Sequence, residues 1–266
     1  MWPMNPMNDT PQLALYSDLK GKAVREEMGR YFICEGRLLV EEALKAAKKC
    51  RLKLVSVLCD SRQSKEWESK ISSDAELFSL VTDEINNLVG FQFHRGVLCC
   101  CEVPAPPNET QIALSPKLLV LPQIDNADNL GQLLRTAAGL GMGAAILGKG
   151  PHPFSRRCVR VSMGAVWKMP VLKCDGLDRV LDAWLQNGHN MKSEIVGTAD
   201  DSNAESAWLW EPADRAALVL GSESDGLDAV WKSKCTKHVR IPMAAKTDSL
   251  NVSAAGAILM AKMVGM

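Results

Sequence analysis

The sequence has no excess of charge of either sign, no paired-cysteine motif and no long apolar run. Its 31 Lys and Arg residues balance 31 Asp and Glu residues, so nucleic-acid binding would need local basic patches. Nine cysteines form no C-x-x-C pair, and four histidines are scattered, so we expect neither a disulfide framework nor a metal site. No apolar stretch reaches about 18 residues, and the first residues lack a basic segment leading into an apolar run. We expect a cytoplasmic protein with reduced thiols and no membrane association.

The composition is that of a globular α/β protein, with 47% hydrophobic and 23% charged residues. Residues 104–117 contain four prolines and few large apolar side chains, which predicts a linker. Residues 20–103 before it and 118–266 after it each alternate strand-like and helix-like segments. This pattern predicts a small α/β domain followed by a larger domain with a mainly parallel sheet covered on both faces.

Ligands of parallel sheets bind outside the carboxyl ends of the strands, so the loops that follow strands are the segments to search. The first such loop, residues 125–131, leaves the strand-like segment LLVLPQI and enters a helix that carries Arg135. Asn129 and Arg135 lie within two helical turns and can converge on one ligand. Taken alone, the segment also fits an ordinary helix cap followed by an exposed arginine.

Two further loops follow predicted strands. Residues 221–227 read G-S-E-S-D-G-L, in which the glycines permit close backbone approach to a ligand, although a plain strand-to-helix turn explains them equally well. Residues 241–243 read I-P-M and are followed by S-L-N-V-S at 249–253. An apolar strand end beside a polar helix start can hold an adenine, but alone it fits a Ser-capped terminal helix.

In this order, N-x-G-x-x-x-R, G-x-E-x-x-G-L and I-P-M with S-L-N-V-S resemble the three motifs of the SpoU (TrmH-type) RNA 2'-O-ribose methyltransferases of the SPOUT superfamily. The segment S-M-G-A at 162–165 resembles the S-x-G-A segment that lies between the first and second motifs in that family. The whole resemblance spans residues 118 to 264. It implies a parallel-sheet SPOUT domain with a C-terminal trefoil knot, S-adenosylmethionine as methyl donor, ribosomal or transfer RNA as substrate, and a homodimer.

In the first domain, Glu35-Gly36 and His94-Arg95-Gly96 resemble the family's small RNA-substrate-binding domain. The sequence departs from the family pattern at Ala127, where Pro is common, at Arg95, where Gln is common, and at residues 244–245, where a Gly is frequent. We expect these departures to affect loop stiffness and RNA binding more than the pocket for the methyl donor.

The resemblance also assigns site residues. Arg135 is expected beside the ribose 2'-hydroxyl, where its permanent charge raises the acidity of the hydroxyl. The implied catalytic residues are Asn129, Arg135, Glu223, Ser249 and Asn251. The implied donor-binding residues are Leu220, Gly221, Ser222, Glu223, Ile241, Met243, Ser249 and Leu250.

A local basic stretch is the candidate RNA contact. No acidic residue lies between Lys149 and Lys173, so phosphate binding is the functional interpretation of its cations, and a solvated basic surface is the alternative. The residues assigned to RNA are Arg156, Arg157, Arg160 and Lys168.

Two other functions remain to be compared with methyl transfer. The first is an RNA-binding module on the same fold without chemistry, which the intact motif residues disfavour. The second is a nucleotide-dependent oxidoreductase, because residues 139–144 satisfy G-x-G-x-x-A. A dinucleotide-binding motif needs its glycines between a strand and the following helix, whereas these glycines follow a predicted helix. The sequence therefore disfavours dinucleotide binding.

Overall fold

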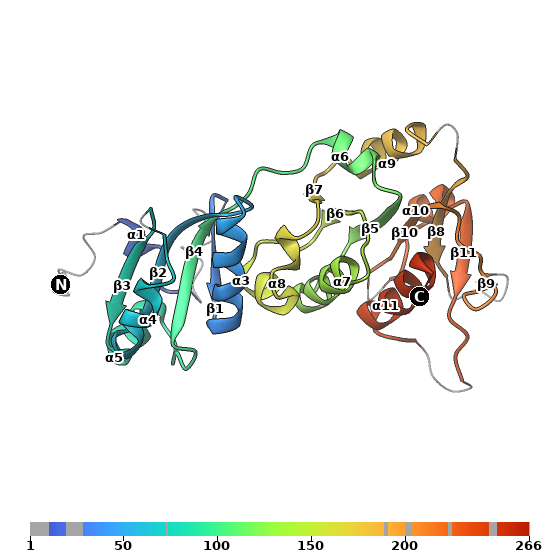
Figure 1. The fold of residues 1–266 in the computed structure, drawn as a ribbon. Helices are drawn as coiled ribbons and strands as arrows, with labels where there is room; N and C mark the ends of the chain where they lie inside the picture. Colours follow the sequence, from blue (N-terminus) through green and yellow to red (C-terminus); the bar gives the residue numbers. More distant parts are fainter. Residues whose placement is uncertain are drawn as a thin grey trace. The chain divides into compact units, whose positions relative to one another are not determined.

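The computed structural model describes residues 11–19, 29–72, 74–188, 191–199, 204–222, 225–244 and 249–265. The chain divides between Ala105 and Pro106 into two compact units (Figure 1). In the described ranges, no helix combines the length and the apolar character needed to cross a membrane.

The first unit is built on a four-stranded sheet in the order β1-β4-β2-β3. β4 pairs antiparallel with both β1 and β2, whereas β2 and β3 are parallel. The sequence pattern predicts strands at YFICEG, LKLVSVLCD and GVLCCCEV, which coincide with β1, β2 and β4, but it does not predict the short, half-exposed β3. The strands are β1 (Tyr31–Glu35), β2 (Lys53–Asp60), β3 (Glu76–Leu80) and β4 (Val97–Glu102); the helices are α1 (Pro11–Ala14), α3 (Arg37–Lys48), η2 (Ser61–Gln63), α4 (Ser64–Glu68) and α5 (Thr82–Val89).

Both faces of this sheet are covered. On one face Tyr16, Ile85 and Phe93 form an apolar core with side chains of the strands, including Cys100. The Tyr16 hydroxyl donates a hydrogen bond of 3.0 Å to the buried Ser56 carbonyl, so this polar group is satisfied inside the core. α3 packs against β1 and β4, and it buries the apolar side chains on one of its faces, Leu39, Val40, Ala43, Leu44 and Ala46.

The second unit contains a seven-stranded sheet in the order β7-β6-β5-β10-β8-β11-β9, and every pairing is parallel. The predicted parallel-sheet α/β fold is confirmed, while the knot stays a prediction. The strands are β5 (Lys117–Gln123), β6 (Ala144–Lys149), β7 (Val171–Lys173), β8 (Ser193–Thr198), β9 (Glu205–Ser206), β10 (Arg215–Val219) and β11 (Lys237–Arg240). The helices are α6 (Glu109–Ala113), α7 (Ala127–Gly139), α8 (Arg156–Ser162), η3 (Ala165–Trp167), α9 (Leu177–Gln186), α10 (Ala229–Lys234) and α11 (Val252–Val264). α6 lies within residues 104–117, the predicted linker, and contacts α9.

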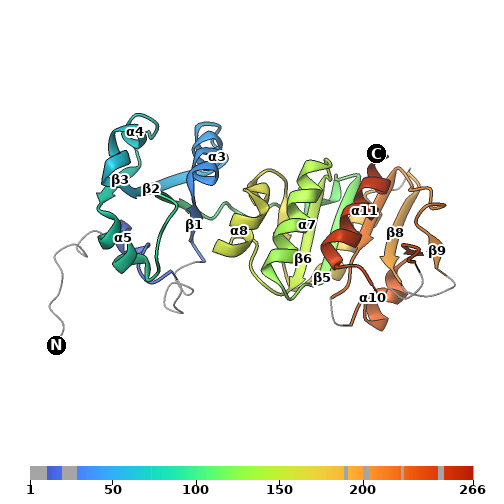
Figure 2. The same cartoon turned by 90° about the horizontal axis from the view of Figure 1, so that it is seen from below.

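Helices cover both faces of this sheet, which explains why its strands are continuously apolar. Leu118 and Val120 of β5 share a core cluster with Leu181 and Trp184 of α9, and the intervening Leu119 and Leu121, which face the other way, are also buried. α7 and α11 lie side by side (Figure 2). Gly256 permits their close approach, because a Cβ there would lie 2.4 Å from Leu133 Cδ2.

Candidate active site

A cavity of about 510 Å³ opens where β8, β10 and β11 end at their carboxyl termini. This volume and position are typical of small-molecule sites in parallel sheets. The walls come from the segments that follow the three strands and from α11. The lining residues are Thr198, Ala199, Leu220, Gly221, Ser222, Gly226, Val239, Arg240, Ile241, Met243, Ser249, Leu250, Asn251, Val252, Ala255 and Leu259.

The cavity gathers the predicted donor-binding residues that the structure describes. The segment after β10 contributes Leu220, Gly221 and Ser222, and the segments after β11 and before α11 contribute Ile241, Met243, Ser249 and Leu250. The predicted residue Glu223 lies outside the described residues. The cavity also includes Thr198, the last residue of β8, and Ala199, the residue after it, which were not predicted as site residues because no motif marks the end of this strand.

The loop after β10 is closed by its own backbone. Ser222 and Gly226 exchange two backbone hydrogen bonds of 3.1 Å. A Cβ at Gly221 would lie 2.0 Å from the carbonyl carbon of Gly226. The need for glycine therefore comes first from packing within the loop, before any approach to a ligand.

A polar network joins α7 to α11 at the cavity wall. Asn251 lines the cavity, and its Nδ2 donates a hydrogen bond of 3.2 Å to Asn129 Oδ1. Asn251 Oδ1 in turn accepts from the backbone N–H of Ser253 at 2.9 Å and caps α11. The Ser253 hydroxyl donates to Gln132 Oε1 at 2.8 Å. The predicted residues Asn129 and Asn251 are thus in direct contact, and Gln132 is an addition that the motifs did not reveal.

Arg135 is the predicted catalytic residue that the structure does not bring to the cavity. It is exposed on α7 and is not among the cavity-lining residues. It lies six positions after Asn129 in α7, which is a rise of about 9 Å along the helix axis. In a single chain the guanidinium is therefore not assembled with the donor pocket.

The residues predicted to contact RNA lie on and near α8. Arg156 and Arg160 are half-buried, whereas Arg157 and Lys168 are exposed. Arg157 forms an ion pair with Asp128, the neighbour of Asn129, and this contact lowers the pKa of the Asp128 carboxyl. Part of the predicted basic surface is thus balanced by an acidic residue from another segment.

The two motif segments of the first unit also lie together. Arg95 Nε lies 3.3 Å from a carboxylate oxygen of the buried Glu35. Gly36 has a φ of 95°, and a Cβ there would lie 3.3 Å from the Arg95 side chain. Arg95 therefore occupies space beside the glycine and pairs with the preceding acid.

A model of the SpoU rRNA Methylase family matches residues 116–261, more than half of the chain. The chain belongs to this family. The predicted family is therefore confirmed, and with it the predicted class of RNA methyltransferase.

Named relatives and a solved structure agree with this membership. RlmP of Bacillus subtilis, a 23S rRNA (guanosine(2553)-2'-O)-methyltransferase, is 28% identical over 233 residues that cover 86% of each chain. RlmB of Haemophilus ducreyi, a 23S rRNA (guanosine-2'-O-)-methyltransferase, is 34% identical over 187 residues, 68% of this chain and 74% of RlmB. The SpoU methyltransferase AviRb from Streptomyces viridochromogenes, crystallised with the cofactor AdoMet, is 20% identical with a TM-score of 0.78, and the match covers 96% of this chain and 98% of AviRb. That likeness shows the shared fold.

Proposed function

We propose that the chain transfers the methyl group of S-adenosylmethionine to a ribose 2'-hydroxyl of structured RNA, either ribosomal or transfer RNA. The observation that carries the proposal is the cavity itself, in which the loops after β10 and β11 and the start of α11 meet beside the Asn129–Asn251 hydrogen bond. Membership of the SpoU rRNA methylase family supports the reaction class.

The residues of the cavity fit a nucleoside-like methyl donor. Ile241, Leu250 and Leu259 offer apolar walls for a flat base, and the backbone after β10 and β11 offers polar groups at its edge. When bound, the donor supplies an electrophilic methyl group on a positively charged sulfur. The protein has to hold the ribose oxygen in line with that methyl group and favour the loss of the hydroxyl proton.

The network of Asn129, Asn251 and Ser253 fixes the polar edge of the site. Its hydrogen bonds tie the starts of α7 and α11 together, so amide groups are held in place before the RNA arrives. Glu223 and Ser249 keep their predicted roles in shaping the site. Arg135 supplies the positive charge that favours the ionised 2'-oxygen, with a water or phosphate accepting the proton.

The working form in this proposal is a homodimer in which Arg135 serves the cavity of the neighbouring subunit. Two features support it. Arg135 lies outside the cavity of its own chain, and α11 is rich in small and apolar residues, of which Ala254, Ala257 and Ile258 retain exposed surface. Small side chains permit close helix packing across a symmetric interface.

The RNA-facing surface includes Arg156, Arg160 and Lys168, in a stretch without acidic residues of its own. Phosphate binding by such cations releases counterions, so RNA affinity should fall steeply with salt. The predicted cytoplasmic location stays a prediction.

Transfer of a labelled methyl group from S-adenosylmethionine to ribosomal and transfer RNA tests the proposal, with the modified position mapped by alkaline resistance of the methylated ribose linkage. We expect labelled RNA whose linkage resists alkali. RNA binding without transfer on either substrate would favour the module without chemistry, and a label on a base would contradict ribose methylation.

A further inference from the structure

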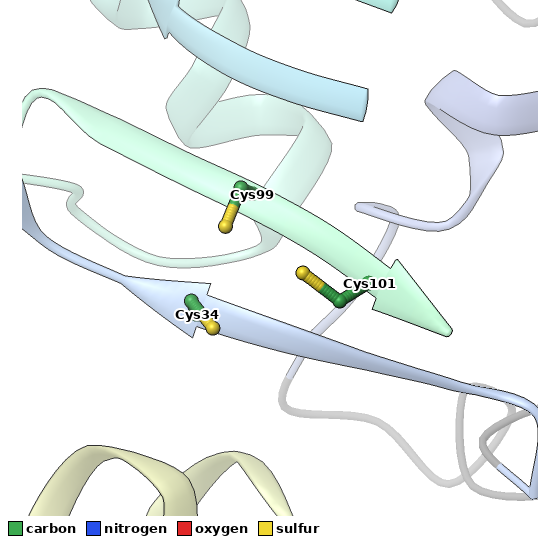
Figure 3. A group of neighbouring side chains, drawn as sticks. All are labelled: Cys34, Cys99 and Cys101. Carbon is green, nitrogen blue, oxygen red and sulfur yellow. The ribbon is translucent and has the colours of Figure 1, made fainter. Parts of the chain in front are cut away.

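Three cysteine side chains meet in the core of the first unit, whereas the residues used in the proposed reaction belong to the second unit. Cys34 comes from β1, and Cys99 and Cys101 come from β4 (Figure 3). Their three sulfur atoms all lie within 4.8 Å of one another, and all three side chains are fully buried.

The strand register produces this cluster. Cys34 is paired with Cys99 in the antiparallel ladder of β1 and β4. Side chains alternate along a strand, so Cys99 and Cys101 share one face while Cys100 faces the opposite core with Tyr16. A search for C-x-x-C spacing misses the group, because its ligands come from a C-x-C strand and a partner 65 residues earlier.

We propose that Cys34, Cys99 and Cys101 form a site for one Cu(I) ion bound by three sulfur atoms. A metal–sulfur distance of about 2.3 Å places three trigonal sulfurs about 4 Å apart, and the cluster allows this with small side-chain shifts. Cysteine thiolates select soft ions such as Cu(I), and binding of the ion releases the thiol protons to solvent. Structural zinc takes four ligands, and no fourth His, Cys, Asp or Glu joins the group among the residues that the structure describes.

Entry of the ion requires only local opening. β1 lies at one end of the strand order, so it can separate from β4 without disrupting the pairing of β4 with β2. Once bound, the ion links this edge strand to its neighbour. The site would then stabilise the first unit and leave the methyl-donor cavity unchanged.

The test uses the full chain with Cys50 replaced by Ala, because Cys50 is an exposed thiol that would bind copper adventitiously. Cu(I) is supplied without oxygen and in competition with a chelator of known affinity. We expect one ion per chain, X-ray absorption showing sulfur ligands at about 2.3 Å, and a raised unfolding temperature. Cys34→Ala and Cys101→Ala should each weaken binding at least tenfold.

Cys100→Ala is the matched control, since it removes a fully buried thiol from the same strand on the opposite face. It should leave the copper affinity unchanged. Equal losses in all three variants, binding that survives Cys34→Ala, or fewer than three sulfur ligands in the absorption spectrum would overturn the proposal. The absorption measurement uses the intact cysteine cluster, so it tests the number of sulfur ligands even if a core variant fails to fold. Methyl transfer is read separately, so failure of either proposal leaves the other intact.

Discussion

Arg157 on α8 donates two hydrogen bonds to the carboxylate of Asp128 on α7. Asp128 stands in the first turn of α7, directly before Asn129, and its backbone N–H is capped by Asn126 Oδ1 at 2.8 Å. The ion pair therefore fixes the segment that presents Asn129 to the cavity network. A residue predicted to contact RNA is thus paired with the acidic neighbour of Asn129.

This arrangement predicts different effects for Arg157→Ala and Lys168→Ala. Removing Arg157 should lower kcat by about fivefold, because an exposed ion pair contributes up to about 1 kcal/mol, and should change the salt dependence of RNA binding little. Removing the exposed Lys168 should reduce the slope of log affinity against log salt by about one unit and leave kcat unchanged. Kinetics and binding titrations at several salt concentrations check both. Similar slope changes in the two variants would contradict the positioning role.

The Ser253–Gln132 hydrogen bond should matter for the chemical step. Gln132→Leu removes one acceptor of the Ser253 hydroxyl and leaves the oxygens of Asn129 and Asn251, so we expect the network to shift and kcat to fall by roughly tenfold with little change in KM for the donor. Gln132→Glu keeps an acceptor oxygen and should restore most of the activity. If the unmodified chain, Gln132→Leu and Gln132→Glu have different melting temperatures but the same kcat, the hydrogen bond contributes to stability alone.

Gly221 should tolerate no side chain. The Cβ of Ala would lie 2.0 Å from a backbone carbon of Gly226, so the loop must open. We expect Gly221→Ala to cost about 1–3 kcal/mol of unfolding free energy and to abolish donor binding in calorimetry. Gly139→Ala, where no atom lies within 4 Å of the added Cβ, is the control and should bind normally. Normal donor binding by Gly221→Ala would contradict the closed loop.

The apolar runs of the sequence predicted every strand of the second unit except the two-residue β9, because parallel strands covered on both faces are continuously apolar and easy to detect. β3 and α5 were missed, since half-exposed segments lack a strong periodic signal. The motif loops were found from their order along the chain. Arg157 and Gln132 were not assigned to the active site, because their roles depend on partners 29 and 121 residues away. Pairing of that kind arises only from the tertiary fold.

Asp60 should make the stability of the first unit depend on pH. Its buried carboxylate accepts hydrogen bonds from Arg62 Nε at 2.7 Å and from the Thr82 hydroxyl at 2.5 Å, which hold its pKa well below the usual range. Because the folded pKa is depressed, the stabilisation is complete above the unfolded value of about 3.9 and is lost progressively below it.

Urea unfolding checks this dependence. Asp60→Asn should be less stable than the unmodified chain at pH 7, and the difference should shrink as the pH falls below about 3.9. Asp83→Asn, which changes an exposed carboxylate of α5, is the control and should show a small difference. A gap between Asp60→Asn and the unmodified chain that stays constant into acid would show that ionisation of Asp60 does not stabilise the fold.

Subunit mixing tests whether Arg135 completes a partner's cavity. Arg135→Ala lacks the charge, and Ala199→Phe fills the cavity wall at a position outside both α7 and α11, so each homodimer should be inactive. If Arg135 acts across the interface, a mixed dimer has one site with an intact cavity and an intact partner arginine. Random pairing of equal amounts then restores about a quarter of the full activity.

Subunits with two different tags, purified in sequence, show whether subunit exchange has occurred. Absence of methyl transfer by the doubly tagged dimers would place Arg135 in the site of its own chain. An active enzyme that sediments as a monomer would exclude a site shared between subunits.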